Sequence, residues 1–339
     1  MEKELRSLAK VYLLVAVSMT YSRYAASTIR PGNLRLVALF PVLCLLPCLP
    51  WSFSSINLRG ISAFFLAWLA LFKLVLLAFG LGPLSPSLPL LPFLFTSSFP
   101  VKLQTKPNPK PPISSSLSTL HLLVTAVKVL LLAAIISIHR YRDGIHPYFL
   151  LAMYCFYIYL GLDLCLTSMG KIATGLLGLE LEPHFNNPCG ASSLQDFWGR
   201  RWNLMVSAIL RPSVYDPVRA RWGRDAGILA TFLVSGLMHE LMFYYLTLAL
   251  PTGEVTAFFV LQGLFTVAEK EARKAGWWRL HPVAAAPLAI GFIVGTGYWL
   301  FFPPLLRGGV DKIGLAECYA VMGFLGDAGG ALLGLLGFL

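Results

Sequence analysis

The sequence is poor in charged residues, and this scarcity restricts the class of protein that it can encode. Only 13% of its 339 residues are charged, whereas 57% are hydrophobic, and the mean hydropathy is +0.70. A soluble domain of this composition could not cover its apolar surface with polar groups. The composition therefore predicts a polytopic membrane protein whose first partner is the lipid bilayer.

Cysteine pairs and nucleotide motifs are also missing. The six cysteines include no CxxC pair, and most lie in apolar runs, which argues against a disulfide framework and against a zinc or other metal site. No phosphate loop or dinucleotide fingerprint is present, so we expect no bound cofactor. The net charge of +11 comes from scattered basic residues without an aromatic-interleaved stripe, so we expect no nucleic-acid partner.

Long apolar runs are abundant. A helix that crosses the hydrocarbon core needs about 20 apolar residues, and such runs predict an all-α fold with about eight or nine transmembrane helices. The second and last runs are the weakest, because prolines interrupt the former and glycines the latter. The runs lie near residues 8–26, 34–50, 59–81, 117–138, 147–169, 226–250, 254–270, 283–306 and 315–338.

These runs divide the chain into three parts. Residues 1–81 hold N-terminal transmembrane helices, residues 82–118 form a linker crowded with proline and serine, and residues 119–339 form a second membrane domain that includes the loop 170–225. The prolines argue against a regular helix in the linker, although Leu88–Phe95 is apolar enough to lie at the membrane interface. Lysine and arginine counts place the loop 170–225 on the cytosolic side.

His239 and Glu240 stand in the middle of the apolar run 226–250. Ionisable residues at that depth are costly and usually functional. Desolvation favours the neutral imidazole, which is the form that a general base requires. The alternative is a histidine that bonds a neighbouring helix for packing alone. Ser235 lies one turn before His239, so its hydroxyl either orients the imidazole or serves helix packing. Glu240 points elsewhere and is expected to form a structural ion pair.

The most distinctive segment of the sequence is SSLQDFWGRRWNLMVSAILRP, from Ser192 to Pro212. A capping box at Ser192 or Ser193 and a stop at Arg211-Pro212 predict one helix over 194–210. Asp196, Arg200, Asn203 and Ser207 would then form one polar stripe. With its tryptophans and arginines, such a helix belongs at the headgroup level or just below it. It is either an interfacial anchor whose polar stripe faces water, or it brings Asn203 to a buried site with His239.

Other polar or small residues in the runs have structural readings. Lys128 and Asp163 are expected to pair across two helices. Gln262 either lines an internal tunnel or bonds another helix. Gly291 and Gly295 form a GxxxG pattern, which predicts close helix packing.

The segments FWGRRWN (197–203) and SGLMHE (235–240) resemble the signature pair of the membrane-bound O-acyltransferase superfamily. SLQDFWGRRWNLMV, followed by LRPSVYDPVR, is similar to the plant wax synthase family, the long-chain-alcohol O-fatty-acyltransferases. The similarity extends over most of the chain, including the ELEPHFNNP segment before the motif. Arg201 replaces the tryptophan of the related sterol and diacylglycerol enzymes, which agrees with the wax synthase branch.

The resemblance implies a horseshoe of helices around an interior tunnel, with His239 as catalytic base and Asn203 as its essential partner. It implies transfer of a fatty acyl group from acyl-CoA, a co-substrate, to a long-chain alcohol in the endoplasmic reticulum membrane. A sterol acceptor and a non-enzymatic lipid transporter are the alternatives, and the sequence does not indicate an oligomeric state. Candidate substrate-binding residues are Trp198, Arg200, Arg201, Trp202 and Gln262, within a cytosolic pool of arginines that also holds Arg211, Arg219, Arg221 and Arg224.

Overall fold

The computed structural model describes residues 2–103, 115–178, 181–276, 282–320 and 323. In these residues the fold is all-α, and extended pairing is limited to an isolated bridge between Leu103 and Leu181. The longer helices are α1 (Glu2–Thr28), α2 (Asn33–Leu45), α5 (Leu90–Ser98), α6 (Ser115–Ile138), α7 (Pro147–Leu177), α10 (Asp216–Thr247), α11 (Glu254–Lys274) and α12 (Pro282–Thr296).

Shorter helical segments extend or join these helices. Three of them are π-helices: η2 (Ala63–Ala70), η5 (Arg211–Tyr215) and η6 (Gly297–Phe301). The others are η1 (Leu46–Ser52), α3 (Ile56–Ser62), α4 (Leu71–Ala78), η3 (His139–Gly144), η4 (Pro188–Gly190), α8 (Leu194–Arg200), α9 (Leu204–Leu210) and α13 (Phe302–Arg307).

The first eight predicted spans coincide with helices, but three of these helices extend well beyond the prediction: α1 begins six residues earlier, α10 begins ten residues earlier, and α7 continues eight residues further. In the described residues, five helical stretches are long and apolar enough to cross a membrane: Asn33–Ser52, Ile56–Ala78, Pro147–Leu177, Leu204–Thr247 and Ala284–Arg307. The fold is thus that of a multi-pass membrane protein, while the count of eight or nine spans stays a prediction. Most of the ninth predicted span lies outside the described residues.

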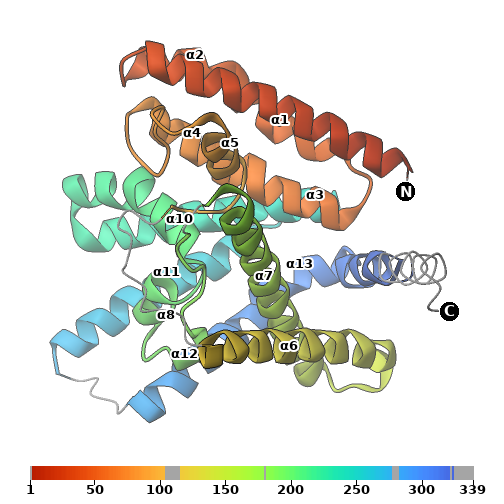
Figure 1. The fold of residues 1–339 in the computed structure, drawn as a ribbon. Helices are drawn as coiled ribbons and strands as arrows, with labels where there is room; N and C mark the ends of the chain where they lie inside the picture. The colour runs from red at the N-terminus through yellow and green to blue at the C-terminus, as the bar shows by residue number, and fades with distance from the viewer. Residues whose placement is uncertain (1, 104–114, 179–180, 277–281, 321–322, 324–339) are drawn as a thin grey trace, which may run out of the picture.

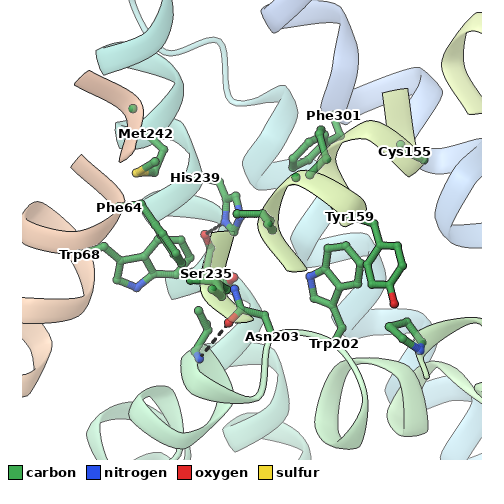
Figure 2. A pocket seen from close by; sticks show the side chains of 18 of the residues that line it. Phe64, Trp68, Cys155, Tyr159, Trp202, Asn203, Ser235, His239, Met242 and Phe301 are labelled. Carbon is green, nitrogen blue, oxygen red and sulfur yellow. Dashed lines mark hydrogen bonds between the residues drawn. The ribbon is translucent and has the colours of Figure 1, made fainter. Parts of the chain in front are cut away.

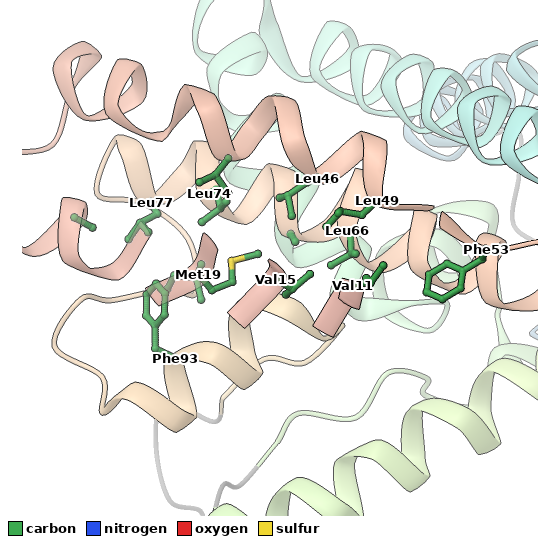
Figure 3. Packing of buried hydrophobic residues seen from close by; sticks show 14 residues of the cluster. Val11, Val15, Met19, Leu46, Leu49, Phe53, Leu66, Leu74, Leu77 and Phe93 are labelled. Carbon is green, nitrogen blue, oxygen red and sulfur yellow. The ribbon is translucent and has the colours of Figure 1, made fainter. Parts of the chain in front are cut away.

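The N-terminal helices form a bundle with its own apolar core. Side chains of α1, η1, α4 and α5, among them Met19, Leu46, Leu74 and Phe93, are almost fully buried there (Figure 3). The expectation that the proline-rich segment holds no regular helix is wrong for α5. Pro89 precedes this helix and Pro92 lies in its first turn, where the missing N–H has no partner in an α-helix anyway.

Three buried cations stabilise this bundle by binding carbonyl groups at helix ends. Lys73 Nζ donates to the carbonyls of Thr96 and Phe99, at 2.6 Å each, where α5 ends. Arg35 binds carbonyls at the ends of α1 and α4, and Arg59 binds those of Tyr245 and Leu246 at the end of α10. These carbonyls carry the negative end of each helix dipole, so within the described residues the three cations are compensated without carboxylate partners.

Helices α10 and α11 pack closely, and Glu240 joins them. Its side chain is 7% exposed, and Oε1 accepts a hydrogen bond from the backbone N–H of Thr256 in the first turn of α11, at 3.1 Å. The structure does not show the expected ion pair at Glu240. Its carboxylate instead lies at the N-terminus of α11, where the helix dipole favours negative charge. A Cβ on Gly236 would lie only 2.9 Å from the Cα of Thr256, which shows how near the backbones are.

Two other expectations about buried polar and small residues have opposite outcomes. Lys128 Nζ lies 2.7 Å from Asp163 Oδ2, so the predicted pair between α6 and α7 is confirmed. The GxxxG pattern does not mark close packing, because a Cβ on Gly291 or Gly295 would meet nothing within 4 Å. Figure 1 shows α10 and α11 between the N-terminal bundle and the helices α6 and α12.

Candidate active site

The motif segment 194–210 is not the single helix that its periodicity predicted. Helix α8 ends at Arg200, and α9 begins at Leu204 with Asn203 as its N-cap residue in the left-handed conformation, with φ of 40°. The prediction that Asp196, Arg200, Asn203 and Ser207 share one helix face is therefore wrong. Only Asp196 and Arg200 lie on the same helix, α8. The predicted helix stop at Arg211-Pro212 is also wrong, because the π-helix η5 connects α9 directly to α10 without a break.

Backbone hydrogen bonds from the preceding ELEPHFNNP segment hold this break. The N–H of Leu204 donates to the carbonyl of His184 at 2.8 Å, and the N–H of Asn186 donates to the carbonyl of Arg201 at 2.9 Å. Asparagine adopts left-handed backbone more readily than most residues. Its Oδ1 accepts from the N–H of Val206 at 3.4 Å, which caps α9. The backbone of Asn203 is thus fixed from both sides.

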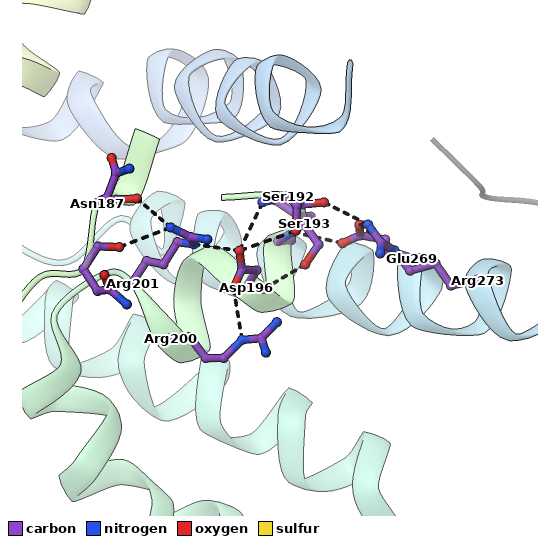
Figure 4. A network of polar contacts seen from close by, with 10 residues as sticks. Asn187, Ser192, Ser193, Asp196, Arg200, Arg201, Glu269 and Arg273 are labelled. Atoms are coloured by element: carbon purple, nitrogen blue, oxygen red, sulfur yellow. Dashed lines mark hydrogen bonds and ion pairs between the residues drawn. The ribbon is translucent and has the colours of Figure 1, made fainter. Parts of the chain in front are cut away.

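A polar network fixes α8 as well (Figure 4). Ser193 caps the helix as predicted by accepting from the N–H of Asp196, whose Oδ2 in turn accepts from the N–H of Ser192. Asp196 also pairs with Arg201, Nε to Oδ2 at 2.6 Å, and with Arg200, Nε to Oδ1 at 3.0 Å. Burial alone would raise the pKa of Asp196, but the hydrogen bonds from Arg201 and Ser192 and the charges of both arginines lower it below its ordinary value.

His239 projects from α10 into a cavity of about 1820 Å³. Its Nδ1 lies 2.7 Å from the carbonyl oxygen of Ser235, and a carbonyl only accepts, so Nδ1 carries the proton and Nε2 the free lone pair. The Ser235 hydroxyl, the expected partner, is not the orienting group. Three rings surround the imidazole: Phe259 stacks on it at 4.2 Å between centroids, Trp68 approaches edge-on at 4.9 Å, and Phe301 lies at 6.0 Å.

Asn203 lines the same cavity as His239, one from α9 and the other from α10 (Figure 2). Because Oδ1 faces the N–H of Val206, the amide NH₂ group is turned outward, and in the described part of the chain no residue accepts a hydrogen bond from it. The cavity therefore offers one basic nitrogen and one amide donor in apolar surroundings.

All three π-helices contribute to the cavity wall. A π-helix is wider than an α-helix and occurs often at functional sites. Each segment here directs side chains inward beside the central helix α10. The residues are Phe64, Phe65 and Trp68 from η2, Arg211 and Tyr215 from η5, and Gly297 and Phe301 from η6.

The other predicted site residues have different positions. Trp198 and Trp202 line the cavity. Gln262 is fully buried and is not one of the described residues that line the cavity. Its side chain accepts a hydrogen bond from the indole N–H of Trp198 and donates one to Thr296, so it joins helices behind the cavity wall. Arg201 is occupied by Asp196 and by the carbonyl of Asn187.

The arginines reach two different places. Arg211, Arg219 and Arg224 line the large cavity, and Arg219 lies over the ring of Tyr215 at 5.9 Å. Arg200 lines a separate small pocket of about 320 Å³ with Lys270 and Arg273. Among the described residues, no group of three or more histidine, cysteine or carboxylate side chains is arranged to hold a metal ion.

Sequence reasoning missed the rings around His239. Trp68 belongs to the third predicted span, Phe259 to the seventh and Phe301 to the eighth, and each stands among other apolar residues. No local pattern separates them from lipid-facing aromatics, because only the tertiary fold brings them to the imidazole.

Known proteins share the site-bearing segment and the rest of the chain. A model of the membrane bound O-acyl transferase family matches residues 181–261, from the ELEPHFNNP segment past His239. A long-chain-alcohol O-fatty-acyltransferase from Simmondsia chinensis is 42% identical over 352 residues, covering 99% of each chain. The probable long-chain-alcohol O-fatty-acyltransferase 1 of Arabidopsis thaliana is 40% identical over 332 residues, covering 95% of this chain and 97% of the relative. The protein therefore belongs to the long-chain-alcohol O-fatty-acyltransferases, the wax synthase family of membrane-bound O-acyltransferases.

Proposed function

We propose that this protein transfers a fatty acyl group from acyl-CoA to a long-chain alcohol and so forms a wax ester in the endoplasmic reticulum membrane. The observation that carries the proposal is the imidazole of His239, held by the Ser235 carbonyl so that Nε2 is free inside an apolar cavity that also holds Asn203. The names of the relatives specify transfer of a fatty acyl group to the oxygen of a long-chain alcohol, which supports the proposal.

His239 is the general base of the proposed reaction. The alcohol gives its hydroxyl proton to Nε2 while its oxygen attacks the thioester carbonyl, forming a C–O bond and placing negative charge on the carbonyl oxygen. Collapse breaks the C–S bond, and the imidazolium returns the proton to the departing thiolate. The products are the ester and CoA, and the histidine is restored.

Asn203 is proposed to stabilise the charge on the carbonyl oxygen. Its Oδ1 is used by the cap of α9, so only its N–H groups face the cavity, and an N–H can donate to the developing oxyanion. Because the backbone of Asn203 is fixed by hydrogen bonds on both sides, the donor is preorganised. Because Oδ1 is already used in the cap, Asn203 is better suited to donate a hydrogen bond to the oxyanion than to accept one from the substrate hydroxyl.

The cavity is suited to two long substrates, one of them charged at its end. Its volume of about 1820 Å³ exceeds the ~300–1,000 Å³ of pockets that hold one drug-sized ligand. Arg211, Arg219 and Arg224 are proposed to bind the CoA phosphates. A helical rise of ~1.5 Å per residue places Arg224 roughly 22 Å from His239 along α10, so the charged part of the cavity lies far from the reacting imidazole.

The test is expression in host cells that lack their own neutral-lipid acyltransferases, fed separately with long-chain alcohols and with sterols. We expect new wax esters, resolved by chromatography of the lipid extract, in cells given alcohols. Sterol esters instead of wax esters would contradict the proposed acceptor. The absence of any new ester, with the protein stably inserted in the membrane, would contradict the enzymatic function and leave a lipid-binding role.

A further inference from the structure

The imidazole of His239 must take up a positive charge in apolar surroundings. In the proposed reaction Nε2 accepts the proton of the alcohol, and a charge away from water costs free energy unless another group compensates it. In Ser-His-Asp triads a carboxylate stabilises the imidazolium. Here the carboxylate of Glu240 binds the N–H of Thr256 on α11, and the ion pairs of the described residues do not include His239. The imidazolium therefore needs another source of compensation besides the Ser235 carbonyl.

The ring of Phe259 is stacked on this imidazole. The two centroids are 4.2 Å apart and the ring planes are inclined by 28°, whereas Trp68 and Phe301 are inclined to the imidazole by 78° and 63°. The face of a benzene ring is the negative part of its quadrupole, and it attracts a cation within about 6 Å of its centroid. Phe259 is the nearest and most nearly parallel of the three rings, so it turns this negative face toward His239.

Packing holds Phe259 in this position. Its side chain is 3% exposed, and its ring lies edge-on to that of Phe258, with centroids 5.1 Å apart. A Cβ on Gly236, one turn before His239, would lie 3.3 Å from the Cβ of Phe259, so the glycine leaves room for this approach. The hydrogen bond of Glu240 to the first turn of α11 joins the same two helices. The stacked ring therefore needs no rearrangement when the imidazole becomes charged.

We propose that Phe259 stabilises the imidazolium form of His239 through a cation–π interaction, in the place that a carboxylate takes beside other histidine bases. The inference rests on the proposed acyl transfer. The attraction is stronger for the charged imidazole than for the neutral one, so it lowers the barrier to proton removal without strengthening substrate binding. Phe259 acts through His239 and exchanges no atoms. The proton passes from the alcohol to Nε2 and then to the thiolate, while the C–O bond forms and the C–S bond breaks.

The experiment changes the charge on the face of the ring and keeps the ring itself. Phenylalanine analogues with one, three and five ring fluorines replace Phe259 by genetic-code expansion, because each fluorine withdraws electron density from the face. Wax ester formation is measured in membranes against acyl-CoA and alcohol concentration, and thermal unfolding is followed in detergent. The same series at Phe265 is the matched control. This residue also lies on α11 and packs on a phenylalanine, Phe292, but is 47% exposed and outside the described cavity wall.

We expect the logarithm of kcat to fall steadily with the number of fluorines at Phe259, to roughly a tenth of the wild-type kcat with five. Both KM values and the unfolding temperature should stay near wild type, since the interaction strengthens only as the imidazole becomes charged. The Phe265 series should leave kcat unchanged. Phe259→Leu, which has no ring, should have a kcat near that of the most fluorinated protein.

A kcat that does not depend on fluorination at Phe259 would overturn the inference. So would an equal dependence at Phe265, or a loss of rate explained wholly by lost folded protein. If wild type itself forms no ester, the proposed function fails instead, and the two results are distinguishable.

Discussion

Asn203 uses the two ends of its side-chain amide for separate tasks. Oδ1 caps α9 through the N–H of Val206, while the NH₂ group faces the cavity. Asparagine also suits the backbone, which has φ of 40°. One residue type thus satisfies the cap, the helix break and the proposed chemistry.

Asn203→Asp separates these tasks. Aspartate caps helices well and tolerates left-handed backbone, so thermal stability should remain within about 0.5 kcal/mol of wild type. The variant lacks the N–H donor, so kcat should fall roughly 10²–10³-fold. Asn203→Ala is the comparison, and it should lose ~1 kcal/mol of stability as well. Wild-type activity in Asn203→Asp would show that the amide donor is not used.

His184, in the ELEPHFNNP segment before the motif, should make the stability of the protein depend on pH. Burial lowers its pKa below the ordinary value near 6.5, although the hydrogen bond to the carbonyl of Pro100 acts in the opposite direction. The unfolded chain therefore binds a proton more readily than the folded protein, and the free energy of unfolding should fall as pH decreases through about 6.5. Thermal unfolding in detergent between about pH 8 and 5 measures this loss.

His184→Gln is the control for that measurement, because glutamine can donate to Pro100 but does not titrate. Its unfolding temperature should change less than that of wild type over the same pH range. Equal slopes for the two proteins would assign the pH dependence to other groups.

At the residue level, the sequence indicated His239 as a catalytic candidate because an ionisable side chain stands in the middle of an apolar membrane span. It indicated Asn203 because this residue ends the FWGRRWN motif. Its prediction for Ser235 named the right residue and the wrong atom, since the carbonyl binds Nδ1. The role of Gln262 was open, and the structure places it behind Trp198. Which atom of a residue faces a cavity depends on tertiary packing that periodicity does not contain.

Among the elements, α10 and α11 position the imidazole. The close approach at Gly236, one turn before His239, fixes how the two helices pack. Gly291 on α12 lies in open surroundings by contrast, although the GxxxG pattern made it the expected contact. Contact between helices thus follows from their placement, and the spacing of glycines alone did not predict it.

Gly236→Ala and Gly291→Ala form a matched pair for this difference. The first should destabilise the protein by about 1–3 kcal/mol through overpacking and lower ester formation, because α10 must shift against Thr256. The second adds a methyl group in open space and should leave stability and activity at or slightly above wild type. Unfolding temperature and wax ester yield per folded protein are the readouts. Equal effects of both substitutions would contradict the packing of α10 on α11.

Helix positions were predictable because a span needs a long apolar run, and the first eight runs agree with helices. The break between α8 and α9 was not, since hydrogen bonds from His184 and Asn186 outweigh a continuous helical pattern. Periodicity reports local preference and does not include backbone partners from a distant segment.

On the scale of the whole molecule, the fold assembles one cavity from parts that are distant in sequence. The π-helix η2 of the N-terminal bundle, the motif helix α9 and the central helix α10 bring Trp68, Asn203 and His239 to one wall. The arginines of η5 and α10 lie toward the other end of α10. This separation gives each part of the proposed substrates its own environment.

Replacing Arg219 and Arg224 together by glutamine should raise KM for acyl-CoA roughly 10²-fold or more, because each lost charge-assisted hydrogen bond contributes ~1.5–3 kcal/mol. KM for the alcohol should stay unchanged. Rates measured against each substrate separately provide the test, and Arg221→Gln, outside the described cavity lining, is the control. A rise in KM for the alcohol instead would place the CoA end elsewhere.

The most direct measurement of the central claim is wax ester formation by His239→Ala in membranes, at a protein level matched to wild type and with saturating acyl-CoA and alcohol. A general base accounts for roughly 10²–10⁴-fold of rate, and we expect a loss in that range with the protein still folded. An unchanged rate would contradict the assignment of His239 as the base and with it the proposed mechanism.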